Sequence, residues 1–374
     1  MLHTSERPPE IERLRAETRG LKYRPAKRKP PAPDPADIRY LFTVEDGNRW
    51  MELGMRQPEA KMLFGEFWHQ HEICILFADT NTGKSVLAVQ IAESIARARA
   101  IDPFTSYAQP AKVLYIDFEL TTNQFYQRYS HQQLPAATSN PTLATHYPQL
   151  NYEFSPNFYR ASFNQVADIP QGIAAYNDHL LAGIEYKLQQ IKATVLIIDN
   201  ISCLQGGTES ALVALRLMSS LKELKARHRL SILVLAHTPK RRNTTRPIST
   251  DDLHGSKLLI NFADSAFAIG KSTADATSCY LKQIKQRNTQ PVYHEGNILL
   301  GRITQPGNWL HFTFESTAPE RNHLQTPTRQ YREQLAQQVN KLYATGITQR
   351  EIATQLNISL GVVNKYIKAD NIKE

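Results

Sequence analysis

Apolar runs and amphipathic stretches alternate along residues 41–315, and this pattern predicts buried strands separated by helices. Uninterrupted apolar runs are typical of strands covered on both faces, whereas apolar residues at helical spacing indicate helices that cover a sheet. Such alternation favours an α/β fold with a mostly parallel sheet. We expect strands at 73–78, 113–117, 194–198 and 231–236, helices at 85–99, 172–191 and 209–228, and antiparallel strands closing one side of the sheet at 265–270, 280–287 and 292–315.

Composition divides the rest of the chain. Residues 1–40 contain seven prolines and a cluster of basic residues, which predicts a disordered tail, with a DNA-binding arm as the alternative. Residues 41–316 form the expected core domain, and the polar, proline-containing residues 317–327 are expected to be a linker. Residues 328–374 have a helical pattern and predict a small all-α domain.

The segment Ala78–Ser85 has the form of a phosphate-binding loop between a strand and a helix. It matches the pattern G-x-x-x-x-G-K-[ST] except that Ala78 replaces the first glycine. In such a loop, backbone N–H groups and the helix dipole converge on phosphate oxygens. Lys84 is expected to reach the β- and γ-phosphates, and the Ser85 hydroxyl to bind Mg²⁺. An ordinary surface turn is the alternative; the candidate nucleotide-binding residues are Thr80, Asn81, Thr82, Gly83, Lys84 and Ser85.

Polar residues end three of the other expected strands. Glu119 follows Asp117, and a carboxylate at that position is suited to orient or deprotonate the water that attacks a γ-phosphate. This hypothesis assumes that the strand lies next to the one that carries the loop. Asp199 ends an apolar run in the form of a Walker B element, which binds Mg²⁺ through water or Ser85. His237 ends the fourth strand, where a polar side chain can sense the γ-phosphate. A purely structural role at a strand end is the alternative for each.

The chain has a formal net charge of +9 and a pI near 9.3, which favours an anionic partner such as nucleic acid. A basic loop at 239–246 and an aromatic-rich stretch at 131–165 are candidates for contacting phosphates and bases. The alternatives are a solvated loop and an insertion that its aromatic side chains anchor to the core. The cysteines predict neither a zinc site nor a disulfide, and the lack of an apolar signal segment or membrane-length run predicts a cytoplasmic protein; the cysteines are Cys74, Cys203 and Cys279.

The order of these motifs resembles the RecA-like P-loop ATPase core, particularly the replicative helicases of the RepA and DnaB type, over about residues 50–315. The resemblance implies ATP and Mg²⁺ as cofactors, with Glu119 as catalytic base, Asp199 as Walker B acid and His237 as sensor. It also implies that 281–288 is the late K-x-R strand of that family, whose Lys285 and Arg287 act in the neighbouring subunit's nucleotide site. A homo-oligomer, possibly a hexamer, that acts on single-stranded DNA is the assembly it implies.

The C-terminal segment has the pattern of a helix-turn-helix. Thr348 and Glu351 form a capping box before one short helix, and Ser359 can cap a second. Two short helices joined by a three-residue turn resemble a helix-turn-helix of the resolvase type, with 328–345 as the preceding helix. The outer face of the second helix is expected to contact duplex DNA, and a generic helical bundle is the alternative; the expected contact residues are Asn364, Lys365 and Lys368.

Two hypotheses of function follow from these patterns. The first is an oligomeric, helicase-type ATPase that acts on DNA in replication or transfer of a plasmid or mobile element. The second is a sequence-specific DNA-binding regulator or initiator whose assembly ATP switches without motor activity. A small-molecule P-loop kinase explains neither the basic tail nor the K-x-R strand.

Overall fold

The structure is a computed structural model that describes residues 42–105, 109–131, 150–164, 173–201, 211–238, 245–253, 257–324, 329–356 and 358–370. The chain divides into two compact units, Met1–Glu59 and Ala60–Glu374. The described part of the first unit contains α2 (Gly47–Met55), which Asp46 caps by accepting a hydrogen bond from the backbone N–H of Arg49. No residue of α2 is buried.

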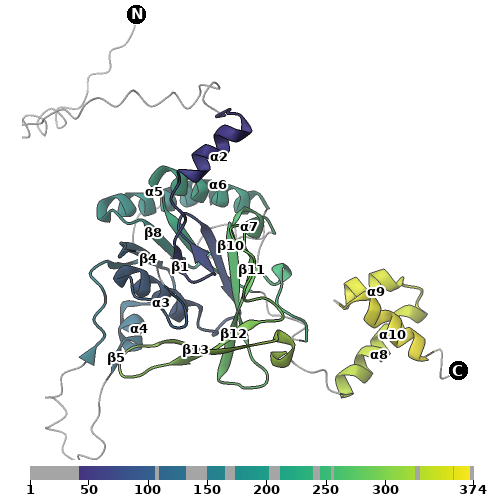
Figure 1. The fold of residues 1–374 in the computed structure, drawn as a ribbon. Coiled ribbons are helices and arrows are strands. Elements are labelled where there is room, and N and C mark those ends of the chain that lie inside the picture. Colours follow the sequence, from purple (N-terminus) through teal and green to yellow (C-terminus); the bar gives the residue numbers. More distant parts are fainter. Residues whose placement is uncertain are drawn as a thin grey trace, which may run out of the picture. The chain divides into compact units, whose positions relative to one another are not determined.

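A nine-stranded sheet forms the centre of the second unit (Figure 1). The six strands from β10 to β7 are parallel, and β11, β12 and β13 extend the sheet as antiparallel strands. This arrangement confirms the expected α/β fold with a mostly parallel sheet. In spatial order the strands are β13 (His311–Ala318), β12 (Ile298–Thr304), β11 (Ser278–Lys285), β10 (Ser265–Lys271), β3 (Ile73–Ala78), β9 (Ser231–His237), β8 (Val195–Asp199), β4 (Val113–Asp117) and β7 (Phe158–Ser162).

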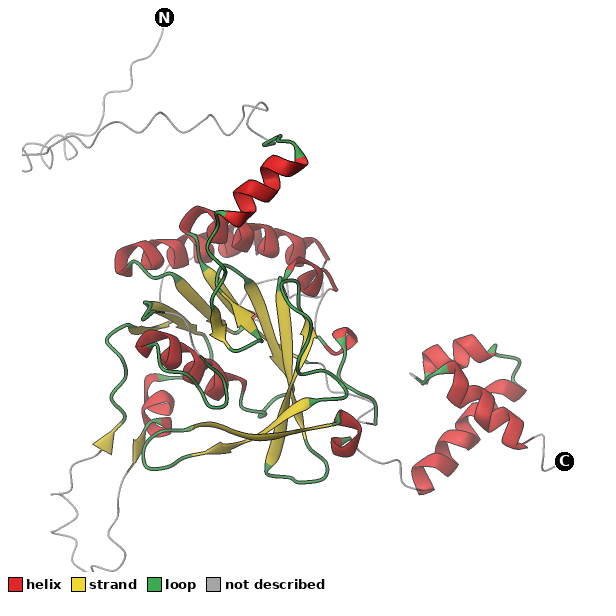
Figure 2. Cartoon of the chain, in the orientation of Figure 1, coloured by secondary structure: helices red, strands yellow, loops and turns green. Residues whose placement is uncertain are grey.

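Helices cover both faces of the sheet (Figure 2). Alternate residues of β3 enter different cores, since Cys74 and Leu76 pack with α3 (Lys84–Arg97), whereas Ile75 and Phe77 pack with the helices of the other face. Those helices are α5 (Ile173–Ile191) and α6 (Ala211–His228). Burial on both faces explains why the central strands are continuous apolar runs. The smaller elements are β1 (Met62–Phe64), β2 (Trp68–His69), α4 (Thr122–Arg128), β5 (Ser130–His131), β6 (Leu150–Asn151), η5 (Thr250–Asp252), α7 (Lys257–Phe262) and η6 (Glu320–His323).

Strand β10 corrects one expectation, because it is parallel to β3 rather than antiparallel. Helix α7 lies between β9 and β10 in the chain, and a crossover of this kind lets a new strand start from the same edge of the sheet as the previous one. Strand β11 then pairs with β10 as an antiparallel hairpin. The antiparallel part of the sheet therefore begins one strand later than expected.

The aromatic-rich stretch adds an edge strand, β7, that was not expected from the sequence. Its residues are only half-buried or exposed, so the stretch lacks the apolar run that marks the central strands. The Tyr152 ring stacks on Trp309 with a centroid distance of 4.1 Å, and Phe154 stacks on Phe158 at 4.9 Å. In the described part of this stretch, aromatic side chains thus anchor the chain to the core. Residues 132–149 and 165 lie outside the described residues.

The folded core continues beyond residue 317, where the linker was expected to begin. Strand β13 runs to Ala318, and Glu320 is fully buried. Its carboxylate accepts hydrogen bonds from the backbone N–H of Ile248 at 2.7 Å and the Tyr280 hydroxyl at 3.0 Å, and it pairs with Lys282. These contacts tie the end of the sheet to the segment before η5.

The C-terminal helices form a separate small core. They are α8 (Arg329–Ala344), α9 (Gln349–Gln355) and α10 (Leu360–Asp370). The expected capping box is present, because Thr348 accepts from the backbone N–H of Glu351 and the Glu351 carboxylate accepts from that of Thr348. Ser359 accepts from the backbone N–H of Val362 at the start of α10. The buried residues shared by the three helices are Val339, Ile352, Val363 and Ile367.

Across the described ranges, no helix combines the length and apolarity that crossing a membrane requires. Cys74 and Cys279 are buried and unpaired, as expected of small core residues. Cys203 and the tail at residues 1–40 lie outside the part of the chain that the structure describes.

Gly270 is the position in β10 at which we expect a methyl group to be most disruptive. A Cβ atom there would lie 2.1 Å from the ring of Tyr280, its partner on β11, which is itself buried. Gly270→Ala should therefore lower the free energy of unfolding by about 1–3 kcal/mol, measured by urea denaturation. The matched control is Gly183→Ala in α5, where a Cβ meets nothing within 4 Å and should stabilise the helix by up to about 1 kcal/mol. Equal effects of the two changes would contradict this packing.

Candidate nucleotide-binding site

The candidate site residues meet at the carboxyl edge of the parallel strands. The register pairs Ala78 at the end of β3 with His237 at the end of β9, and Asp117 at the end of β4 with Asp199 at the end of β8. Parallel strands end at the same edge, so the polar residues that follow them are neighbours. One assumption was wrong: β4 is not next to β3, because β9 and β8 lie between them. The loop after β4 nevertheless brings the Glu119 carboxylate to 3.3 Å from His237 Nε2.

The loop after β3 has the backbone of a phosphate cradle. Its left-handed residues are Asn81, with φ 58°, and Gly83, with φ 92°, immediately before α3 begins at Lys84. The Thr82 hydroxyl donates to the Asp79 carbonyl at 2.7 Å and closes the turn. Ala78 remains within β3, where extended backbone suits any residue. The departure from glycine at this position therefore requires no strained conformation.

Lys84 lies beneath this loop with its ammonium group largely buried. Its Nζ donates to the carbonyl oxygens of Ala78 and Asp79, each at 3.0 Å. Burial lowers the pKa of Lys84, and the nearby carboxylates of Glu119, Asp199 and Asp79 oppose that shift. A poorly hydrated cation at a helix N-terminus is suited to bind phosphate oxygens.

Asp199 is a deeply buried acid of the site, with 1% of its surface exposed. The Tyr115 hydroxyl donates to its Oδ2 at 2.5 Å. Burial raises the pKa of Asp199 to about 6, although the nearby Ser85 hydroxyl and the hydrogen bond from Tyr115 act in the opposite direction. Among the described residues, none donates a hydrogen bond to its Oδ1.

This arrangement fits a magnesium ion shared with a phosphate. Mg²⁺ prefers oxygen ligands and is commonly held by one or two carboxylates together with substrate phosphates. The unpartnered Asp199 oxygen beside the Ser85 hydroxyl offers such a partial ligand set. In the described ranges, no group of three or more His, Cys, Asp or Glu side chains is placed to hold a metal ion.

Glu119 belongs to a hydrogen-bonded cluster that includes a residue sequence reasoning missed. Asn200 is 2% exposed, and its Nδ2 contacts both the Glu119 carboxylate and His237 Nε2, the latter at 2.9 Å. The sequence shows an asparagine after Asp199, but only the strand order reveals that its amide lies between the two flanking strands.

The loop that carries Glu119 is fixed from the edge of the sheet. The Asp117 carboxylate accepts from the backbone N–H groups of Glu119 at 3.0 Å and Leu120 at 2.8 Å. Arg160 of β7 donates from Nε to the other oxygen of Asp117 at 3.0 Å and also to the Leu120 carbonyl. Arg160 was not among the predicted residues, because β7 itself was not recognised.

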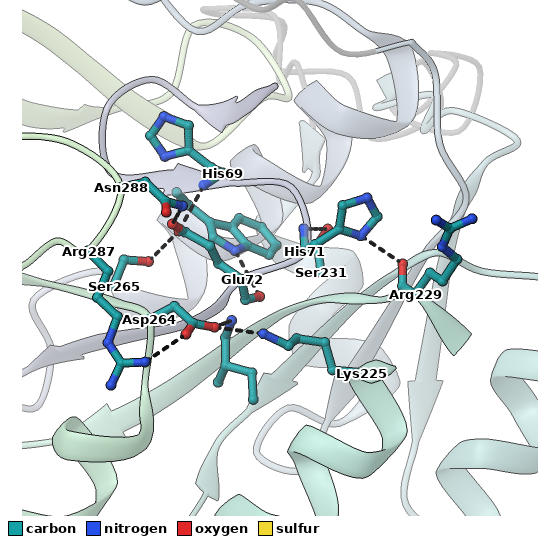
Figure 3. Close-up of polar contacts among 12 residues, drawn as sticks. His69, His71, Glu72, Lys225, Arg229, Ser231, Asp264, Ser265, Arg287 and Asn288 are labelled. Carbon is teal, nitrogen blue, oxygen red and sulfur yellow. Dashed lines mark hydrogen bonds and ion pairs between the residues drawn. The ribbon is translucent and has the colours of Figure 1, made fainter. Parts of the chain in front are cut away.

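Lys285 and Arg287 lie at the opposite edge of the sheet, and Figure 3 shows Arg287 beside Asp264. Lys285 donates to the carbonyls of Ile260 and Asn261 at the end of α7, at 2.7 and 3.0 Å. Arg287 pairs with Asp264 at 3.3 Å, and Asp264 also accepts from the backbone N–H of Ile73, where β3 begins. Because the phosphate loop follows the other end of β3, the pair does not approach the chain's own candidate site.

The C-terminal candidates are only partly described. On α10, Lys365 is exposed and Asn364 is half-buried, whereas the side chain of Lys368 lies outside the described residues. Residues 239–244 of the basic loop also lie outside the described residues.

The fold and the geometry of this site define the class of P-loop nucleotide-binding domains. The chain belongs to the family described as AAA domain, whose model matches residues 43–243. A second family model, described as winged helix-turn-helix DNA-binding, matches residues 345–369. Neither match singles out the RepA and DnaB type or the resolvase type.

One solved structure with similarity is that of a KaiC-like protein from the hyperthermophilic archaeon Pyrococcus horikoshii OT3. It shares 14% sequence identity, with 66% of this chain and 91% of that chain covered and a TM-score of 0.42. No curated protein sequence matches the chain.

Asp199→Asn should stabilise the nucleotide-free protein when the acid is ionised. The folded pKa of about 6 lies above the ordinary value of 3.8, so burial penalises the charged form in the folded state only. Asparagine has no such penalty, and its oxygen can still accept from Tyr115. At about pH 8 the variant should gain about 1–3 kcal/mol in free energy of unfolding, measured by urea denaturation.

The gain should shrink as the pH falls through about 6 toward about 4, because wild-type Asp199 then takes up its proton and the penalty disappears. A difference that is constant over this range, or a variant less stable at about pH 8, would contradict the desolvation of Asp199.

Proposed function

We propose that the chain binds ATP with Mg²⁺ and hydrolyses it, and that this activity is directed at DNA by an oligomer of helicase type. The observation that carries the proposal is the meeting of Lys84, Asp199 and Glu119 at one edge of the sheet, beside a backbone cradle. The family described as AAA domain supports the same class of activity.

Different side chains bind the phosphates, hold the metal ion and accept the proton. The loop from Thr80 to Ser85 and the Lys84 ammonium bind the phosphates, while Ser85 and Asp199 hold Mg²⁺, which neutralises phosphate charge. Glu119, whose side chain is 41% exposed, accepts a proton from the attacking water through its carboxylate. His237 lies where a γ-phosphate can replace its present partners and so report that the phosphate is bound.

DNA is the partner that the C-terminal helices favour. The match to a winged helix-turn-helix DNA-binding family and the exposed Lys365 support binding of duplex DNA there. Single-stranded DNA at the core, and a role in replication or transfer of a mobile element, rest on the resemblance to RepA- and DnaB-type helicases.

The placement of Lys285 and Arg287 supports a homo-oligomer, and its hexameric state rests on the resemblance to RepA- and DnaB-type helicases. The Arg287 side chain is 49% exposed at the edge opposite its own loop. A head-to-tail interface would bring this edge to the loop of a second copy, where a guanidinium stabilises charge on the transferring phosphoryl group.

A second candidate is an ATP-switched, sequence-specific regulator or initiator without motor activity. The helix-turn-helix favours it, because such domains select one duplex sequence, whereas a general motor needs no such selection.

The test of the proposed function is the ATPase rate of the full chain without DNA, with single-stranded DNA and with duplex DNA. We expect DNA to stimulate the rate and Lys84→Ala to abolish it, because the ammonium contacts the phosphates. Light scattering with and without ATP reports the assembly on the same samples. Wild-type turnover that Lys84→Ala leaves unchanged would remove the loop from the mechanism.

Removal of residues 326–374 separates the two candidates. A motor retains ATPase activity stimulated by single-stranded DNA, whereas a regulator loses all DNA binding. Failure of assembled wild-type protein to separate a forked duplex would exclude the motor.

Arg287→Ala should lower the ATPase rate by about 10³-fold or more while nucleotide binding persists, if Arg287 acts on a second copy's phosphates. The matched control is Arg227→Ala on α6, an arginine that is 56% exposed and also paired with a carboxylate. The control should remain close to wild type.

Mixing subunits tests action between copies directly. Arg287→Ala chains keep an intact loop, and Lys84→Ala chains keep an intact arginine, so a mixture forms complete sites at about a quarter of head-to-tail interfaces. Activity that returns on mixing two inactive variants supports the assignment. A mixture as inactive as its components contradicts it.

A further inference from the structure

We infer that Asn200 is a positioning residue that joins the base Glu119 and the sensor His237 into one hydrogen-bonded unit. Through this unit, binding of a γ-phosphate at His237 is transmitted to the carboxylate that receives the proton. The inference rests on the proposed ATPase function and adds a residue that the motifs do not include.

The strand order gives Asn200 its place. Strand β8 lies between β9 and β4, and Asn200 directly follows its last residue. His237 ends β9 on one side, and Glu119 follows β4 on the other. A side chain from the middle strand is thus able to contact functional groups of both neighbours.

The amide group suits this position chemically. An asparagine amide carries two N–H donors and remains neutral over the physiological pH range. The amide Nδ2 contacts Glu119 Oε1 and lies 2.9 Å from His237 Nε2, which accepts a hydrogen bond when the ring proton is on Nδ1. Donation to Oε1 leaves Oε2 free to accept a proton from water.

Burial protects the hydrogen bonds of the Asn200 amide from water. Asn200 is 2% exposed, so water does not readily replace a hydrogen bond that its amide loses. Glu119 also interacts electrostatically with Lys84 from α3 and with Asp199 from β8, the residue before Asn200. A neutral donor orients the base among these charges without adding another.

A γ-phosphate changes this arrangement by competing for His237. When the imidazole turns to donate to a phosphate oxygen, Asn200 keeps Glu119 as its acceptor. Its amide then no longer divides its two N–H groups between the base and the imidazole, and the Glu119 carboxylate is oriented by the amide alone. Loss of the amide should consequently impair the chemical step more than nucleotide binding.

Two variants test the inference. Asn200→Asp has the same shape but cannot donate when ionised, and Asn200→Ala removes the amide without adding charge. Each should lower kcat by about tenfold or more and change ADP affinity by no more than about twofold, measured with a fluorescent nucleotide. The matched control is Asn157→Asp, which removes an amide donor to the Ala96 carbonyl away from the site. It should leave kcat within about twofold of wild type.

A double-mutant cycle distinguishes positioning from general disruption. In single-turnover assays, Asn200→Ala should cost little in a Glu119→Gln background if the amide acts through that carboxylate. His237→Gln, whose amide oxygen can accept the same hydrogen bond, should retain more kcat than His237→Ala.

The inference is overturned if either Asn200 variant keeps kcat within about twofold of wild type. It is also overturned if Asn200→Ala lowers the single-turnover rate by the same factor in the Glu119→Gln background as in wild type. It is also overturned if ADP affinity falls as far as kcat. Wild-type protein without ATPase activity would instead refute the proposed function first, since Lys84→Ala would then change nothing.

Discussion

The register of the parallel strands is the constraint on which the site depends. Strands β3, β9, β8 and β4 end at one edge, and each is followed by polar groups that the apolar strand itself cannot accommodate. Because side chains alternate between the two faces of a sheet, a slip of β8 by one residue would move Asp199 and the apolar residues of that strand to the opposite face. The two buried cores therefore stabilise the same register that assembles the phosphate loop, the acids and His237. Stability and site geometry share one cause.

That edge carries an electrostatic cost that the cores offset. Burial raises the pKa of Asp199 and lowers that of Lys84, so in both residues it disfavours the charged form. Proximity to opposite charge reduces this cost for Lys84. A bound phosphate and its cation would supply the missing partners, since the phosphate takes up the ammonium donors and the cation takes up the carboxylate oxygen. Unmet polar capacity of this kind is typical of a functional site.

Much of the core was predictable, because strands buried on both faces are continuous apolar runs and their terminal acids stand out. Asp199, Glu119 and His237 were located in this way, and Gly-Lys-Ser located the loop. The order of strands was not predictable, since each apolar run looks alike, and so the distance between β4 and β3 was misjudged. Asn200 and Arg160 were missed for the same reason: their partners lie on other strands, and β7 has no apolar run. The direction of β10 depends on the crossover through α7, which periodicity does not reveal.

Arg287 lies at the edge of the sheet opposite the phosphate loop, and this placement is why a complete site requires more than one chain in the proposed mechanism. Arg287 is held by Asp264 and the Asn261 carbonyl, and Asp264 is itself shared with Lys225 and the start of β3. These contacts fix the arginine about the length of a strand away from its own phosphate loop, roughly 16 Å for the residues of β3. Side-chain rotation cannot cover that distance. If Arg287 contributes to hydrolysis at all, the phosphate it contacts belongs to another copy, and the rigid sheet sets the spacing between the two sites.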